Sequence, residues 1–74
     1  MTIEDFIDEF ANVFDDTERD ELTAETNFRE LEEWSSLHAL ATMSMLEQIF
    51  GKRVSVEEMK KQNTILDLYH LVVD

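Results

Sequence analysis

Apolar residues recur in the first part of the chain at the spacing of an α-helix. They lie three or four positions apart, with acidic residues between them, so that a helix would place them on one face. These positions are Ile3, Phe6, Ile7, Phe10, Val13 and Phe14. We therefore predict an amphipathic helix over residues 3–14, with Thr2 as its N-cap and Asp5 in the first turn, where the helix dipole favours negative charge.

A second helix is predicted over residues 36–50. Gly51 follows it, and a glycine there can take the left-handed conformation that ends many helices. The apolar residues of this segment form two stripes. The first, expected to face the core, is Ala39, Leu40, Met43, Leu46 and Phe50, and the second is Leu37, Ala41 and Met45. Either a neighbouring segment covers the second stripe, or the stripe is free to dock a partner.

The rest of the chain predicts a long connection and two more helices. Residues 15–34 are mostly polar and lack helical periodicity, although three apolar residues can hold them on the core: Leu22, Phe28 and Leu31. A capping box over residues 55–58 predicts a short helix to about residue 62. Asn63 and Thr64 can cap a last helix, whose inward residues would be Ile65, Leu68, Tyr69 and Val72. With no proline and only one glycine, the predicted fold is all-α, a small four-helix bundle of three main helices and a short third one.

Length and charge limit the classes of function. A chain of 74 residues is predicted to form a single domain over residues 1–74. Eighteen acidic against six basic residues give a formal charge of −12, which disfavours nucleic acid and anionic membranes and favours basic protein surfaces. The absence of cysteine argues against disulfides and a zinc-thiolate site, and no segment reaches the length of a membrane span. We expect a cytoplasmic monomer.

Candidate chemistry is confined to a pair of serines. The chain has no G-x-S-x-G motif or phosphate-binding glycine loop, and His38 is expected to be an exposed or capping imidazole, so we predict neither an enzyme nor a metal site. If Ser35 is the N-cap of the second helix, its hydroxyl can accept from the amide of Leu37 or His38. Ser36 is then the first helical residue, with an outward hydroxyl beside amides that favour an attached phosphate. The alternative is that both serines are only caps.

The stretch WSSLHALATMSMLEQIFG, together with the order of helices around it, resembles the acyl carrier protein family over essentially the whole chain. The resemblance implies that Ser36 receives phosphopantetheine from coenzyme A through a separate phosphopantetheinyl transferase. The thiol of this arm would carry acyl groups as thioesters for fatty-acid or related biosynthesis. Implied partners are the transferase and enzymes that load and process the acyl group, which would have basic docking surfaces. Met43, with Phe6 or Phe28, could admit an acyl chain between the helices or simply pack in the core.

The sequence departs from the family's pattern in two ways. Ser35 stands where these carriers usually have aspartate, and the second helix has a single acid, Glu47, in place of a row of acids. We therefore expect partners to contact apolar residues together with a few acids: Glu32, Glu33, Leu37, Ala41, Met45 and Glu47. Glu33 and Trp34 replace the glycine pair of many peptidyl carriers, which favours an acyl carrier. The alternatives are an aminoacyl or peptidyl carrier, or an acidic interaction module that carries no covalent group.

Overall fold

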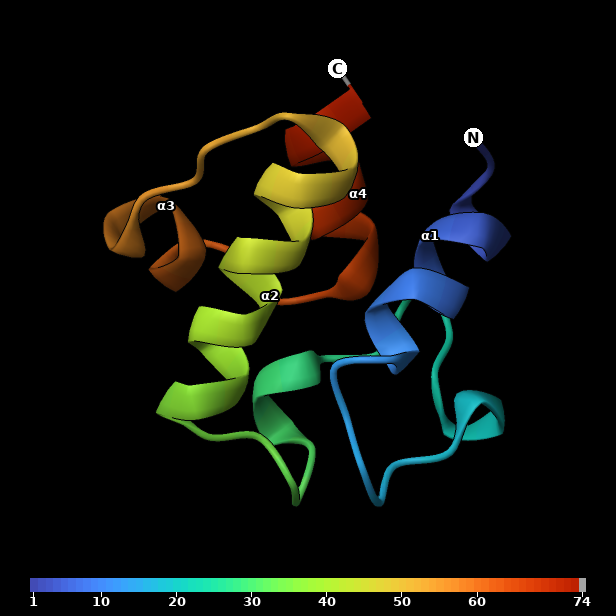
Figure 1. The fold of residues 1–74 in the computed structure, drawn as a ribbon. Coiled ribbons are helices and arrows are strands. Elements are labelled where there is room, and N and C mark those ends of the chain that lie inside the picture. The colour runs from blue at the N-terminus through green and yellow to red at the C-terminus, as the bar shows by residue number, and fades with distance from the viewer. Residues whose placement is uncertain (74) are drawn as a thin grey trace.

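The computed structural model describes residues 1–73, which form a small bundle of helices (Figure 1). Its elements are α1 (Ile3–Ala11), the short 3₁₀ turns η1 (Arg19–Glu21) and η2 (Phe28–Glu30), α2 (Ser36–Phe50), α3 (Val56–Lys60) and α4 (Ile65–Val73). Helices α1, α2 and α4 pack against one another, and the short α3 lies on the far side of α2 from α1. No strand occurs within this part of the chain, so the all-α prediction is confirmed.

Helix α1 begins as predicted but ends earlier. The Thr2 hydroxyl accepts from the amide of Asp5, whose carboxylate accepts from the amide of Thr2. The predicted end at Phe14 is wrong, because the helix stops at Ala11. Beyond it the amide of Phe14 donates to the carbonyl of Ala11, a tighter turn that keeps the Phe14 ring in the core. The apolar spacing therefore continued past the end of the regular helix.

Helix α2 has the predicted bounds, and Gly51 ends it with φ of 67°. The prediction that Leu40 faces the core is wrong, since its side chain is 59% exposed, whereas Thr42 is completely buried. At 100° per residue Leu40 lies about 120° around the helix from the buried Leu46, beyond the core face. Thr42 lies within that face and satisfies its hydroxyl by donating to the carbonyl of His38 at 2.8 Å.

The connection between α1 and α2 is held on the core as predicted, by Leu22 and Phe28, which are both buried. Backbone hydrogen bonds join it to the start of α4: the amides of Ile65 and Leu66 donate to the carbonyls of Thr26 and Ala24 at 3.1 and 2.9 Å. The connection therefore has a defined path, which runs below α1 and beside the first half of α2 (Figure 1).

The last two helices begin at capping boxes. Ser55 and Glu58 exchange side-chain and backbone hydrogen bonds at the start of α3, as predicted, but this helix ends at Lys60. At α4 the amides of Thr64 and Asn63 donate to the carboxylate of Asp67, and these bonds lower its pKa. Ile65 and Leu68 are buried. Among the residues described, no helix is both long enough and apolar enough to cross a membrane.

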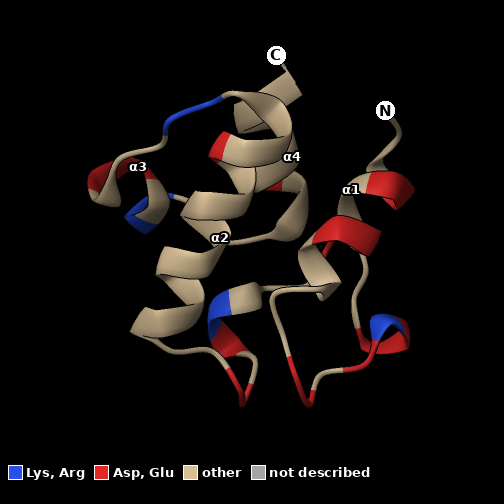
Figure 2. Cartoon of the chain, viewed as in Figure 1, with Lys and Arg blue, Asp and Glu red and all other residues tan. Residues whose placement is uncertain are grey.

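Acidic and basic side chains are separated over the bundle. Asp and Glu gather on α1 and on the connection, whereas the only acid of α2 is Glu47 (Figure 2). Basic residues lie on η2, at the end of α3 and in the segment after α2, and Arg19 lies on η1 among the acids. The negative charge predicted from composition is therefore concentrated away from α2.

Candidate functional site

The two serines have different surroundings at the start of α2. Ser35 has extended backbone angles and accepts a long hydrogen bond of 3.4 Å from the amide of His38, as predicted for an N-cap. Ser36 is the first residue of the helix and is exposed. Within residues 1–73 the Ser36 hydroxyl makes no hydrogen bond to the protein. The hydroxyl of Ser36 is thus open to solvent and to other molecules at the helix N-terminus.

The His38 side chain supports the cap from the other side. Its Nδ1 lies 2.7 Å from Oγ of Ser35, and its Nε2 lies 3.5 Å from the carboxylate of Glu33. The ring stacks on Phe14, with centroids 5.2 Å apart and an interplanar angle of 16°. The sequence predicted an exposed or a capping imidazole for His38. The structure shows the capping one, and its side chain is largely buried. Over the described residues no group of side chains is suited to hold a metal ion.

The carboxylate of Glu33 joins the two ends of the connection. It accepts from the amides of Asp15 at 2.8 Å, Asp16 at 3.1 Å and Thr17 at 2.8 Å, and from the Thr17 hydroxyl at 2.8 Å. Burial alone would raise the pKa of Glu33, but the hydrogen bonds from Asp15, Thr17 and Asp16 outweigh it and lower the pKa to about 2. Glu33 is thus ionised and fixed just before the serines.

Trp34 fixes the segment before the serines on the aromatic core. Its ring lies 4.8 Å from that of Phe28 in an edge-to-face arrangement and also contacts Phe10 and Phe14. The residue directly before the serine pair is therefore packed, and this holds the start of α2 in place.

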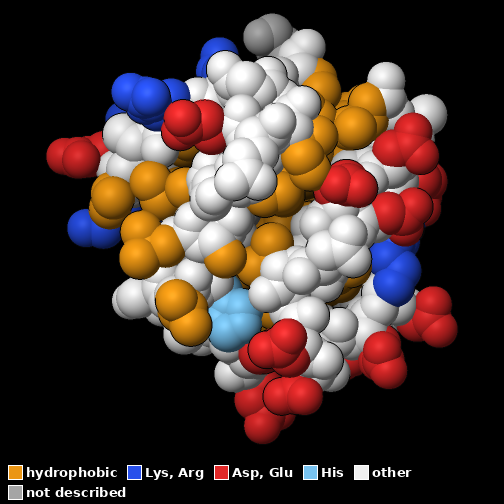
Figure 3. Space-filling model, in the orientation of Figure 1, with side chains coloured by type: hydrophobic (Ala, Val, Ile, Leu, Met, Phe, Trp, Pro, Cys, Tyr) orange, Lys and Arg blue, Asp and Glu red, His pale blue; other side chains and the backbone are white. Residues whose placement is uncertain are grey.

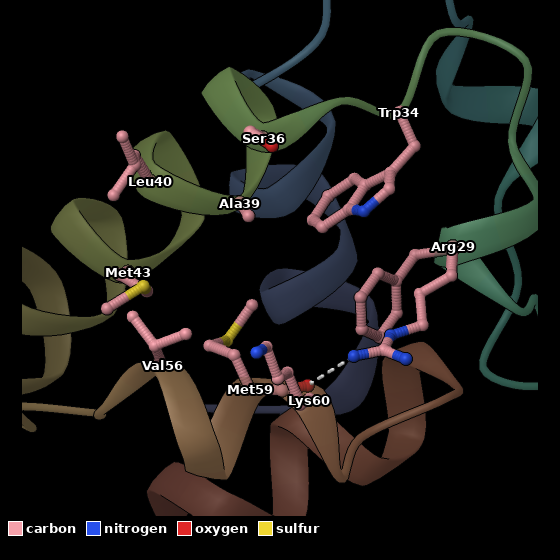
Figure 4. A pocket seen from close by; sticks show the side chains of 10 residues that line it. Arg29, Trp34, Ser36, Ala39, Leu40, Met43, Val56, Met59 and Lys60 are labelled. Atoms are coloured by element: carbon pink, nitrogen blue, oxygen red, sulfur yellow. Dashed lines mark hydrogen bonds between the residues drawn. The ribbon is translucent and has the colours of Figure 1, made fainter.

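A pocket of about 460 Å³ opens beside Ser36, between α2 and α3 (Figure 4). Its apolar walls are formed by Phe28, Trp34, Ala39, Leu40, Met43, Val56 and Met59. Arg29 and Lys60 add two cationic side chains to the lining. Of the residues expected to admit an acyl chain, Met43 and Phe28 line this pocket, whereas Phe6 is completely buried elsewhere in the core. The volume is within the range of small-molecule sites.

The residues predicted to contact partners lie in different environments. Leu37 and Ala41 are exposed on the outer face of α2, and Leu37 is 73% exposed. Met45 is partly buried against the core. Glu32 is exposed, as is Glu47, whose carboxylate lies 3.4 Å from Nη2 of Arg53. On the face shown in Figure 3, apolar side chains lie between α2 and α3 and also between α2 and α1.

The sequence did not reveal the environment of Glu33 or the exposure of Leu40. The Glu33 carboxylate binds amides from residues 16 to 18 positions earlier, and no local motif marks such a contact. The helical spacing already places Leu40 about 120° from Leu46. The core face of α2 is centred correctly only when Thr42 is counted as buried, and a polar residue is not expected there from the sequence.

Comparison with known proteins identifies one match. The family model described as "Phosphopantetheine attachment site" matches residues 4–72. No curated protein sequence matches the chain, and no solved structure does so.

Proposed function

Because the chain belongs to the family of phosphopantetheine attachment domains, we propose that it is an acyl carrier protein whose arm is attached to Ser36. The family's prosthetic group is phosphopantetheine, held covalently. The observation that supports Ser36 as the attachment site is its exposed hydroxyl on the first residue of α2. Ser35, its neighbour, is engaged by the backbone and ring of His38.

The surroundings of Ser36 fit a phosphodiester and a flexible arm. The first amides of a helix have no partner within the helix, and together with the helix dipole they favour an anion at this end. The neighbouring pocket offers apolar surface to the arm or to the group it carries. When bound, the arm supplies a thiol that holds an acyl group as a thioester.

The residues of this chain position the acceptor hydroxyl and leave chemistry to other enzymes. His38 is the ionisable ring at the start of α2, and its nitrogens face Ser35 and Glu33. The phosphopantetheinyl transferase would therefore activate the hydroxyl of Ser36, and this chain would take no catalytic part. Glu33 and Trp34 hold the segment that presents the serine.

We propose that partners dock on the outer face of α2. Leu37 and Ala41 supply apolar contacts, with Met45 at the edge of the face, and Glu32 and Glu47 supply acidic contacts to basic partner surfaces. Glu33 was predicted to contact partners, but we no longer include it, because the amides of residues 15–17 bind its carboxylate. We further propose that residues 1–74 act as one carrier domain, in a cytoplasmic monomer that serves fatty-acid or related acyl biosynthesis.

The attachment site is tested by intact mass spectrometry. Wild type, Ser36→Ala and Ser35→Ala are each incubated with coenzyme A, magnesium and a broad-specificity phosphopantetheinyl transferase. We expect the mass of one phosphopantetheine on wild type and Ser35→Ala and none on Ser36→Ala. Modification of Ser36→Ala would overturn the assignment of the site. If no variant is modified, and Ser36→Ala binds the same proteins as wild type does, the chain is an interaction module and not a carrier.

A further inference from the structure

Two cationic side chains line a largely apolar pocket in a strongly acidic protein. Arg29 comes from η2 and Lys60 from the end of α3, and no Asp or Glu that the structure describes lines the pocket. The chain has 18 acidic and only six basic residues, most of its acids being on α1 and the connection (Figure 2). Two of the six basic residues therefore line a pocket whose lining, among the described residues, includes no acid.

Arg29 and Lys60 form no ion pair with a carboxylate of residues 1–73. Arg19 pairs with Glu4 and Asp8, and Arg53 pairs with Glu47. Among the described residues, neither Arg29 nor Lys60 has a carboxylate oxygen within 4.0 Å of its charged nitrogens. Both charges are therefore available to an anion from outside the protein.

Arg29 is held in position toward the pocket. Its Nη2 donates to the carbonyl of Met59 at 3.3 Å, which ties η2 to α3 across the pocket (Figure 4). A guanidinium has five N–H donors, so this single bond leaves others free to bind an anion. The side chain can thus bind a ligand without first losing an ion pair.

The position of the cations points to the carried group and not to the attachment phosphate. In Figure 4, Ser36 and Lys60 lie at opposite ends of the pocket, with Ala39 and Met59 between them. A phosphate on Ser36 would lie at the α2 end, where the helix amides are available to it. An anion beside Lys60 would belong to a part of the arm or acyl group farther from the serine.

We propose that the acyl group held by this carrier bears a carboxylate, which Arg29 and Lys60 bind while its carbon chain lies against the apolar walls of the pocket. The inference rests on the proposed function, because it requires an arm on Ser36. A neutral acyl chain would gain nothing from the two charges, whereas a carboxylate entering an apolar pocket needs a charged partner to offset its loss of water.

The test compares two acyl groups of equal size on the same arm. From the corresponding acyl-coenzyme A, the transferase transfers to Ser36 a phosphopantetheine that carries either an ω-carboxyacyl group or the matching ω-carboxamide, and adenosine 3′,5′-bisphosphate leaves. Intact mass confirms loading. We then measure the NMR shifts of the Arg29 Nε–H and the Trp34 indole N–H, and the rate at which an added thiol cleaves each thioester. We expect the carboxylate form to shift the Arg29 signal and to be cleaved about two- to fivefold more slowly than the carboxamide form.

Variants identify the cations responsible. Arg29→Gln and Lys60→Gln should each reduce the difference between the two acyl groups, whereas Lys61→Gln, a lysine outside the pocket lining, should leave it unchanged. Equal shifts and equal rates for the two acyl groups would overturn the inference. It would also fail if the unacylated arm alone produced the full Arg29 shift, because the phosphodiester would then be the bound anion. Absence of the arm from Ser36 in the mass spectrum would instead overturn the proposed function.

Discussion

At the scale of single residues, Glu33 couples the stability of the fold to pH. Its carboxylate is bound by amides of residues 15–17, and its pKa is lowered from 4.5 to about 2. A lowered pKa means that the folded state stabilises the ionised carboxylate more than the unfolded state does. Its contribution to stability is therefore complete above pH 4.5 and is lost as pH falls toward 2.

We predict that Glu33→Gln lowers Tm near neutral pH by on the order of 5 °C, because an amide group cannot accept from all these donors at once. The difference in Tm from wild type should shrink as pH falls below 4.5, as the wild-type carboxyl becomes protonated. Thermal melts followed by circular dichroism from pH 7 down to pH 2.5 would measure it. The control is Glu32→Gln, at an exposed neighbour. A Tm difference independent of pH would contradict the prediction.

The residues around the serines differ in how far they could be predicted from sequence. The Ser35 cap and the left-handed Gly51 are local features, which depend on residues within one turn of the helix, and both were predicted. The Glu33 contact depends on where a distant turn of backbone comes to lie, so tertiary structure was needed to find it. The same holds for Arg29 and Lys60, which are 31 positions apart and meet only at the pocket.

At the scale of elements, α2 presents an outer face that is nearly without charge and in which exposed apolar residues alternate with polar ones such as Ser44 and Gln48. Its single acid, Glu47, already lies near Arg53. Met45 is partly buried, so a charge introduced there would also disturb the packing of α2, and Leu37 is the better residue for a docking test. The exposure of Leu37 and Ala41 could be predicted from the second apolar stripe of the helix. The exposure of Leu40 could not, because a hydrophobic pattern counts Thr42 as polar and so misplaces the centre of the core face.

We predict that Leu37→Asp raises the KM of the phosphopantetheinyl transferase for this carrier about tenfold or more, since apolar anchors at the centre of an interface carry much of the binding energy. Glu47→Lys should raise KM less, by about two- to fivefold, because an exposed ionic contact such as the one proposed for Glu47 contributes less than an apolar anchor. Steady-state kinetics with both variants, each shown by thermal melts to be folded like wild type, provides the measurement. A large effect of Glu47→Lys with none of Leu37→Asp would mean that docking depends on the acid.

At the scale of the whole molecule, one aromatic cluster holds both the bundle and the site. Phe10 is completely buried and contacts the rings of Phe14, Phe28 and Trp34. Phe28 and Trp34 also line the pocket beside Ser36, and Phe14 stacks on His38. The same packing that joins α1 to the connection therefore sets the position of the proposed attachment site.

We predict that Phe10→Ala lowers the free energy of unfolding by about 3–5 kcal/mol, which is much of the 5–15 kcal/mol typical of a domain. Leu37→Ala, at a side chain that is 73% exposed, should change it by less than about 0.5 kcal/mol. Urea unfolding followed by Trp34 fluorescence measures both variants, and an unchanged midpoint for Phe10→Ala would contradict the packing described. Because Phe10 supports Trp34 and Phe28 from behind, loss of its ring should also loosen the pocket. The stability of the fold and the placement of the proposed attachment site then depend on the same few side chains.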